Sequence, residues 1–136
     1  MRKSEKVLVY GDYDVDGTTA TSCLYTFLKE FGVEADYYIP HRFKEGYGIN
    51  PDGIKYAEEI NATLIVSVDC GITAIEEAKV AKEKGIDLII CDHHTVWRKH
   101  PRCRGCSGSQ TPGLRITLLT DFQGAGVGFK LIQGTI

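Results

Sequence analysis

VLVYGDYDVDGTTA, residues 7–20, joins an apolar run to a group of carboxylates. The apolar residues predict a buried strand over residues 6–11. Asp12, Asp14 and Asp16 then follow within five residues, and Gly17 comes directly after them. Negative charge concentrated at the end of a buried strand requires a partner. That partner is either the N-terminus of a helix, which an aspartate can cap, or a cation.

Strands and helices alternate along the rest of the chain, which predicts an α/β fold with a doubly wound parallel sheet and helices on both faces. Asn50 followed by Pro51 is typical of a helix start. The expected helices cover residues 18–31, 51–60 and 72–85, and the expected further strands cover residues 33–40, 63–69 and 86–92.

Acidic and imidazole side chains stand at the ends of three of these strands. They are Asp12, Asp14, Asp16, Asp69, Asp92, His93 and His94. In such folds ligands bind outside the carboxyl ends of the strands, so these groups are expected to meet at one edge. Carboxylates with an imidazole favour Mn²⁺ or Mg²⁺. The set is large enough for two ions that share a carboxylate, about 3.5–4 Å apart.

Several alternatives apply to single members of this set. Any one aspartate after a strand can be an N-cap only. A calcium loop beginning at Asp12 would need a glutamate at its twelfth position, where the chain has Cys23. Cys23, Cys70 and Cys91 lie in apolar elements, where a reduced thiol behaves as a small hydrophobe, so a disulfide framework is not expected.

Composition sets broad limits. The 136 residues are 43% hydrophobic and 25% charged, which suits one globular domain. The net charge of −2 gives no bulk indication of a nucleic-acid or membrane partner. No apolar run approaches the roughly 20 residues of a membrane span, and the N-terminal run is too short for a secretion signal. A cytoplasmic protein is therefore expected.

The segments DYDVDG, VDCG and DHH together resemble the DHH phosphoesterase superfamily, and YIPHRFKEGYGIN is similar to the RecJ single-strand-specific exonucleases within it. The resemblance covers roughly residues 6–96. It implies a phosphodiesterase with two Mn²⁺ or Mg²⁺ ions that degrades single-stranded DNA from the 5′ end, in DNA repair and recombination.

The resemblance also implies residue roles. Asp14, Asp16, Asp69 and His93 would be metal ligands, with Asp69 bridging the ions. His94 would stabilise charge on the scissile phosphate, and Asp12 and Asp92 would orient the ligands. Arg42, in the loop of residues 41–50, is expected to hold a phosphate of the substrate; the alternative is a solvated connecting loop.

One position departs from part of the superfamily. Pyrophosphatases and small-oligonucleotide phosphodiesterases usually carry a histidine where this chain has Tyr10. The departure favours the RecJ branch over a phosphodiesterase for cyclic dinucleotides or short oligonucleotides. A non-catalytic single-strand-binding replication module of the same fold is the other alternative.

Residues 97–123 do not fit the resemblance, because they are rich in arginine and fit neither helix nor strand until the segment LRITLL. Two compensating frameshifts, a divergent insertion that binds nucleic acid, and half of a zinc site at Cys103 and Cys106 are the competing explanations. The sequence ends without the family's fourth-motif aspartate and without room for its DHH-associated domain. A partial DHH domain over residues 1–136 is thus expected.

Overall fold

A computed structural model describes residues 5–41, 43–44, 48–71, 73–92 and 114–118. Its elements, in chain order, are β1 (Lys6–Tyr10), α1 (Val15–Glu30), β2 (Glu34–Tyr38), α2 (Pro51–Glu59), β3 (Leu64–Val68), α3 (Ile75–Glu83), β4 (Asp87–Asp92) and β5 (Leu114–Leu118). In this part of the chain no helix is long and apolar enough to cross a membrane.

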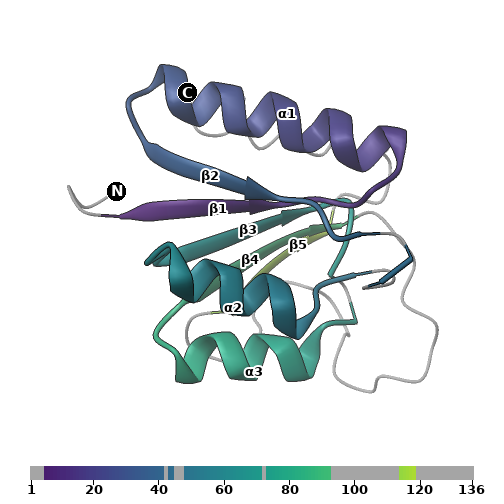
Figure 1. The fold of residues 1–136 in the computed structure, drawn as a ribbon, viewed down its shortest axis with the longest axis vertical. Coiled ribbons are helices and arrows are strands. Elements are labelled where there is room, and N and C mark those ends of the chain that lie inside the picture. Colours follow the sequence, from purple (N-terminus) through teal and green to yellow (C-terminus); the bar gives the residue numbers. More distant parts are fainter. Residues whose placement is uncertain (1–4, 42, 45–47, 72, 93–113, 119–136) are drawn as a thin grey trace.

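The five strands form one parallel sheet in the order β2-β1-β3-β4-β5. Helix α1 covers one face of this sheet, and α2 and α3 cover the other (Figure 1). The predicted doubly wound α/β fold is therefore confirmed. The chain runs outward from β1 to β2 and then crosses back to β3, so the winding direction reverses between β1 and β3.

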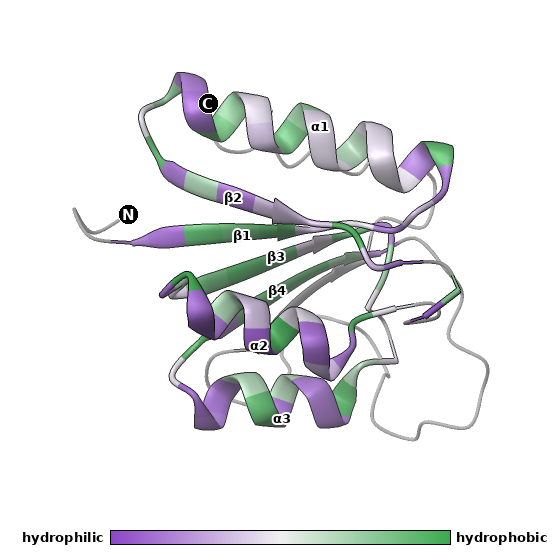
Figure 2. Ribbon diagram, in the orientation of Figure 1, coloured by the Kyte–Doolittle hydropathy of each residue, from purple (hydrophilic) through white to green (hydrophobic). Residues whose placement is uncertain are grey.

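Alternation along the strands builds two cores. In β1, Val7 and Val9 join the cluster beneath α1, while Leu8 and Tyr10 join the cluster beneath α2 and α3. Strands β1, β3 and β4 are apolar along most of their length, whereas the edge strand β2 is more polar (Figure 2). Strands buried on both faces fix the register of the sheet, and with it the positions of the turns that follow them.

Helix α1 begins at Val15 and not at Thr18 as predicted, because the Asp14 carboxylate caps it. Asp14 Oδ1 accepts a hydrogen bond from the N–H of Gly17 at 2.7 Å. Hydroxyl groups of the next two turns donate to backbone carbonyl oxygens four residues earlier; they belong to Thr18, Thr19, Thr21 and Ser22. Gly17, which the prediction placed before the helix, lies within its first turn.

Other sequence expectations fare differently. The helix start at Asn50 and Pro51 is confirmed, since Asn50 Oδ1 accepts from the N–H of Gly53 at 2.8 Å. Of the three cysteines expected in apolar elements, Cys70 and Cys91 are buried and Cys23 is exposed. Helix α1 buries only one stripe, and Cys23 lies outside it.

Strand β5 falls inside the segment 97–123, whose other residues lie outside the described part of the chain.

Gly53 provides a test of the packing between α2 and the sheet. A β-carbon at this position would overlap the ring of Tyr10. Replacing glycine by alanine within a helix normally stabilises a protein by about 0.5–1 kcal/mol. Here we expect Gly53→Ala to lower the free energy of unfolding by about 1–3 kcal/mol, because the added methyl group would overpack the core beside Tyr10. Urea denaturation measures the change in the free energy of unfolding. Lys55→Ala is the matched control, because Lys55 is an exposed residue of the same helix. A Gly53→Ala protein that is more stable than the unaltered chain would contradict this packing.

Candidate metal centre

The turn after β1 is compact and holds Asp12 in a buried position. Only 3% of Asp12 is exposed, and its Oδ1 accepts a hydrogen bond from the N–H of Tyr13 at 2.7 Å. Gly17 lies directly against it, since a β-carbon there would stand 2.7 Å from Asp12 Cβ and 2.8 Å from its carbonyl oxygen. The absence of a side chain at Gly17 therefore lets the start of the helix approach Asp12 closely.

The turn after β3 has an unusual backbone. Asp69 adopts a positive φ of 62°, and Gly71 follows with a φ of 106°. The N–H of Asp69 donates to the carbonyl of Cys91 at 2.8 Å, and buried Ser67 donates through Oγ to the carbonyl of Cys70 at 2.9 Å. Left-handed conformations outside glycine are uncommon and cluster at functional sites. These bonds hold the Asp69 side chain at the edge of the sheet.

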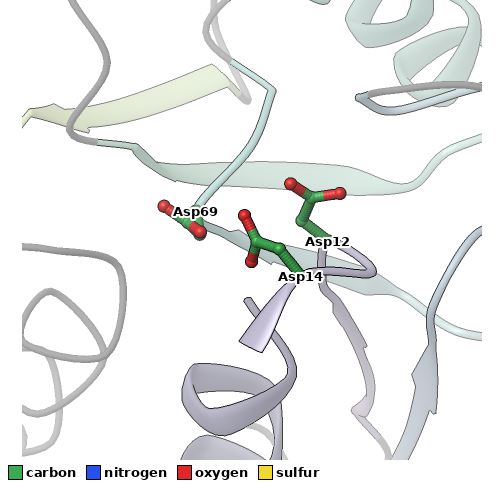
Figure 3. A group of neighbouring side chains, drawn as sticks. All are labelled: Asp12, Asp14 and Asp69. Carbon is green, nitrogen blue, oxygen red and sulfur yellow. The ribbon is translucent and has the colours of Figure 1, made fainter. Parts of the chain in front are cut away.

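The two turns bring three carboxylates together. Oxygen atoms of Asp12, Asp14 and Asp69 lie within 4.8 Å of one another. Figure 3 shows the side chain of Asp14 between those of Asp12 and Asp69. Asp12 and Asp69 are buried and Asp14 is exposed, so the group has one open side. It lies between the ends of β1 and β3, where the winding of the sheet reverses, which is where folds of this type bind ligands.

Negative charge dominates the surroundings of the nearby thiols. Burial raises the pKa of Cys70 well above its usual value, and the carboxylates of Asp92, Asp12, Asp69 and Asp14 raise it further. Burial, followed by Asp92, raises the pKa of Cys91 to about 11. Four carboxylates thus lie near enough to the buried Cys70 thiol to raise its pKa. The raised pKa values favour the protonated form of both thiols. The candidate metal ligands in this region are therefore the carboxylate oxygens of Asp12, Asp14 and Asp69.

The structure brings together some of the predicted site residues. Asp14 and Asp69 converge as expected, and Asp12, predicted only to orient ligands, joins them. Asp16 lies in the first turn of α1 and is not one of the three, while Asp92 is fully buried at the end of β4. Sequence reasoning missed Ser67, for which a hydroxyl inside an apolar strand was the available signal. The predictions on His93, His94 and Arg42 lie outside the described residues.

Fold and carboxylate group together define an α/β domain with a candidate divalent-metal site. The chain belongs to the DHH family: it matches the family's N-terminal domain over residues 6–135.

Relatives and solved structures agree with this assignment. The single-stranded-DNA-specific exonuclease RecJ of Bacillus subtilis is 44% identical over 98% of this chain, and that of Thermus thermophilus 36% over 97%. The chain spans only 17% and 19% of those two proteins. A crystal structure of exonuclease RecJ bound to manganese is similar with a TM-score of 0.77, at 34% identity, over 97% of this chain and 33% of that one. CDC45 from Entamoeba histolytica, with a TM-score of 0.61 at 10% identity, shares the fold alone.

Replacing one carboxylate of the group tests its electrostatics. Asparagine tolerates the backbone of Asp69 and removes one of three neighbouring negative charges. With metal chelated, we expect Asp69→Asn to raise the free energy of unfolding by about 1 kcal/mol through lost repulsion. Added Mn²⁺ should stabilise the unaltered chain by binding the folded state, and stabilise Asp69→Asn much less.

Urea denaturation in the presence of EDTA measures the effect of the lost repulsion, and urea denaturation in the presence of Mn²⁺ measures the stabilisation by the metal. Asp52→Asn is the matched control, because Asp52 is exposed in the first turn of α2 and stands outside the group. An equal Mn²⁺ effect on Asp69→Asn and on the unaltered chain would exclude this metal site.

Proposed function

We propose that this chain is the metal-binding core of a nuclease that hydrolyses single-stranded DNA in the 5′-to-3′ direction, in DNA repair and recombination. Residues 1–136 would form most of one catalytic domain. The observation that carries the proposal is the meeting of Asp12, Asp14 and Asp69 at the edge of the sheet. Identity of 44% to a RecJ exonuclease supports the reaction and the substrate.

The donor set fits Mn²⁺ or Mg²⁺, because its atoms are hard carboxylate oxygens. Asp14 and Asp69 are the first proposed ligands, and their distance to Asp12 supports Asp12 as a third. Asp69 would bridge two ions, and Asp92 would orient its neighbours. Asp16 and His93 are the further proposed ligands. When bound, such ions supply an activated water and neutralise charge on the phosphate.

Groups of this chain would hold the DNA beside the metal site. His94 is proposed to stabilise charge that develops on the scissile phosphate. The N-terminus of α1, which follows Asp14 directly, would point the positive end of the helix dipole toward a phosphate. Arg42 is proposed to hold a phosphate, and its neighbours Phe43 and Lys44 are exposed. An exposed aromatic ring beside basic residues suits single-stranded nucleic acid.

The two alternatives are less well supported. A non-catalytic module would not need the three neighbouring carboxylates, two of them buried, that this chain keeps. A phosphodiesterase for cyclic dinucleotides or short oligonucleotides is disfavoured because Tyr10 points into the core beneath α2 and replaces a histidine. Metal-independent binding of single-stranded DNA without hydrolysis would be the result expected of the module.

The proposed role of Asp14 as a metal ligand can be tested separately from its role as the N-cap of α1. Asparagine caps a helix as well as aspartate does, so Asp14→Asn should keep the fold while losing a ligand charge. With Mn²⁺ and 5′-labelled single-stranded DNA, cleavage by the unaltered chain would release short 5′ products, whereas absence of cleavage alone would fit a chain that lacks the fourth-motif aspartate and the DHH-associated domain. Asp14→Asn should be slower by about a hundredfold or more.

Circular dichroism checks that Asp14→Asn is folded, and Asp52→Asn should retain the activity. Equal cleavage by Asp14→Asn and the unaltered chain would point to a contaminating nuclease. Absence of both Mn²⁺-dependent cleavage and Mn²⁺ binding in the unaltered chain would refute the proposal.

Arg42 is tested through the salt dependence of binding. A lysine or arginine that contacts a phosphate releases a counterion, so its loss weakens affinity and reduces the salt slope. We expect Arg42→Ala to lower the slope of log K against log salt by about 1, measured by fluorescence anisotropy on single-stranded DNA. Lys82→Ala, at the exposed last turn of α3, is the control. An unchanged slope for Arg42→Ala would mean that the loop only connects elements.

A further inference from the structure

Tyr10 makes two hydrogen bonds to one short segment of the loop before α2. Its side chain is completely buried at the end of β1. The hydroxyl donates to the carbonyl oxygen of Gly48 at 3.0 Å and accepts from the N–H of Asn50 at 3.2 Å. A single phenol group therefore holds both ends of the segment Gly48–Asn50, here called the tethered segment.

The tethered segment contacts one residue close to each of the two turns that carry the carboxylates. On one side it is bonded to Tyr10, two residues before Asp12. On the other side Ile49, which is 6% exposed, packs over Gly71, two residues after Asp69. A β-carbon at Gly71 would stand 2.9 Å from Ile49 Cδ1, so the approach is close. The position of the segment is thus defined relative to both sides of the metal centre.

The ring of Tyr10 is held independently of its hydroxyl. Gly53 of α2 packs so close to it that a β-carbon there would stand 2.2 Å from Tyr10 Cε2, and the centroid of the Tyr38 ring is 5.3 Å away. Tyr38 in turn contacts Tyr56 at 5.4 Å, and the Tyr56 hydroxyl donates to Asp36 Oδ2 at 3.1 Å. Removing the hydroxyl of Tyr10 would therefore leave the ring in place and remove only its two hydrogen bonds to the tethered segment, which would then be held by Ile49 and by the cap of α2 alone. Tyr56 offers the same chemical change at the far end of the same row of rings.

We propose that Tyr10 is a positioning residue for substrate binding: its hydroxyl fixes the tethered segment, at the end of the loop that carries the exposed Phe43 and Lys44, beside the two turns that hold the carboxylates. The inference rests on the proposed function. Tyr10 acts on the affinity for single-stranded DNA and not on the affinity for the metal, because it faces α2 and not the group of Asp12, Asp14 and Asp69. A histidine at this position would lack the reach of a phenol to Gly48.

The test compares the 136-residue chain with Tyr10→Phe and Tyr56→Phe. Three quantities are measured: hydrogen exchange of peptides covering residues 48–50, Mn²⁺ affinity by calorimetry, and affinity for a 5′-phosphorylated oligothymidine by anisotropy. Tyr10→Phe should exchange faster in the tethered segment and bind the oligonucleotide about fivefold more weakly, with unchanged Mn²⁺ affinity. Tyr56→Phe should resemble the unaltered chain in all three.

The outcomes separate this inference from the proposed function. Equal oligonucleotide affinities for the two variants would overturn it, and so would a loss of Mn²⁺ affinity in Tyr10→Phe. If the unaltered chain binds no single-stranded DNA, the proposed function fails, and hydrogen exchange alone decides on the tether. Faster exchange in Tyr10→Phe then supports the tether, and unchanged exchange overturns it.

Discussion

The adjacency of β1 and β3 in a parallel sheet is the constraint on which the candidate metal centre depends. Parallel pairing places the carboxyl ends of both strands at one edge, in the register Val7 to Leu64 through Tyr10 to Ser67. Helix α1 leaves β1 toward one face, while the other helices cover the opposite face. The space between the two turns is consequently available to side chains, and carboxylates separated by more than fifty residues meet there.

Much of the fold could be predicted because buried parallel strands are short apolar runs between helices of regular spacing. The residue at which α1 begins could not be predicted in this way. A glycine at position 17 normally indicates the end of a loop, yet the Asp14 carboxylate bonds to that glycine's own N–H and begins the helix three residues earlier. Cys23 shows the same limit: an apolar residue in a helix is exposed or buried according to the helix's rotation, which the packing of Leu24 and Leu28 decides.

Convergence of Asp14 and Asp69 was predictable from strand order, because aspartates at strand ends share an edge. That Asp12 joins this group could not be predicted in the same way, since it depends on where α1 starts: Asp12 stays in the turn, while Asp16 lies in the first turn of the helix. The left-handed backbone of Asp69 has no sequence signal either. It is accompanied by a local hydrogen bond from Ser67 to the carbonyl of Cys70, and by a bond from the N–H of Asp69 to the carbonyl of Cys91 that requires β3 and β4 to pair.

The row of hydroxyl groups in α1 has a consequence for how the protein assembles. Serine and threonine are weak helix formers, and side chains that bond to their own backbone stabilise helix and non-helical turns alike. The longest helix of the described chain thus has little tendency to form by itself, and relies on the sheet and on Asp14. Any cation that engages the Asp14 carboxylate changes the cap as well, so ion occupancy and the order of the first turn of α1 belong to one thermodynamic cycle.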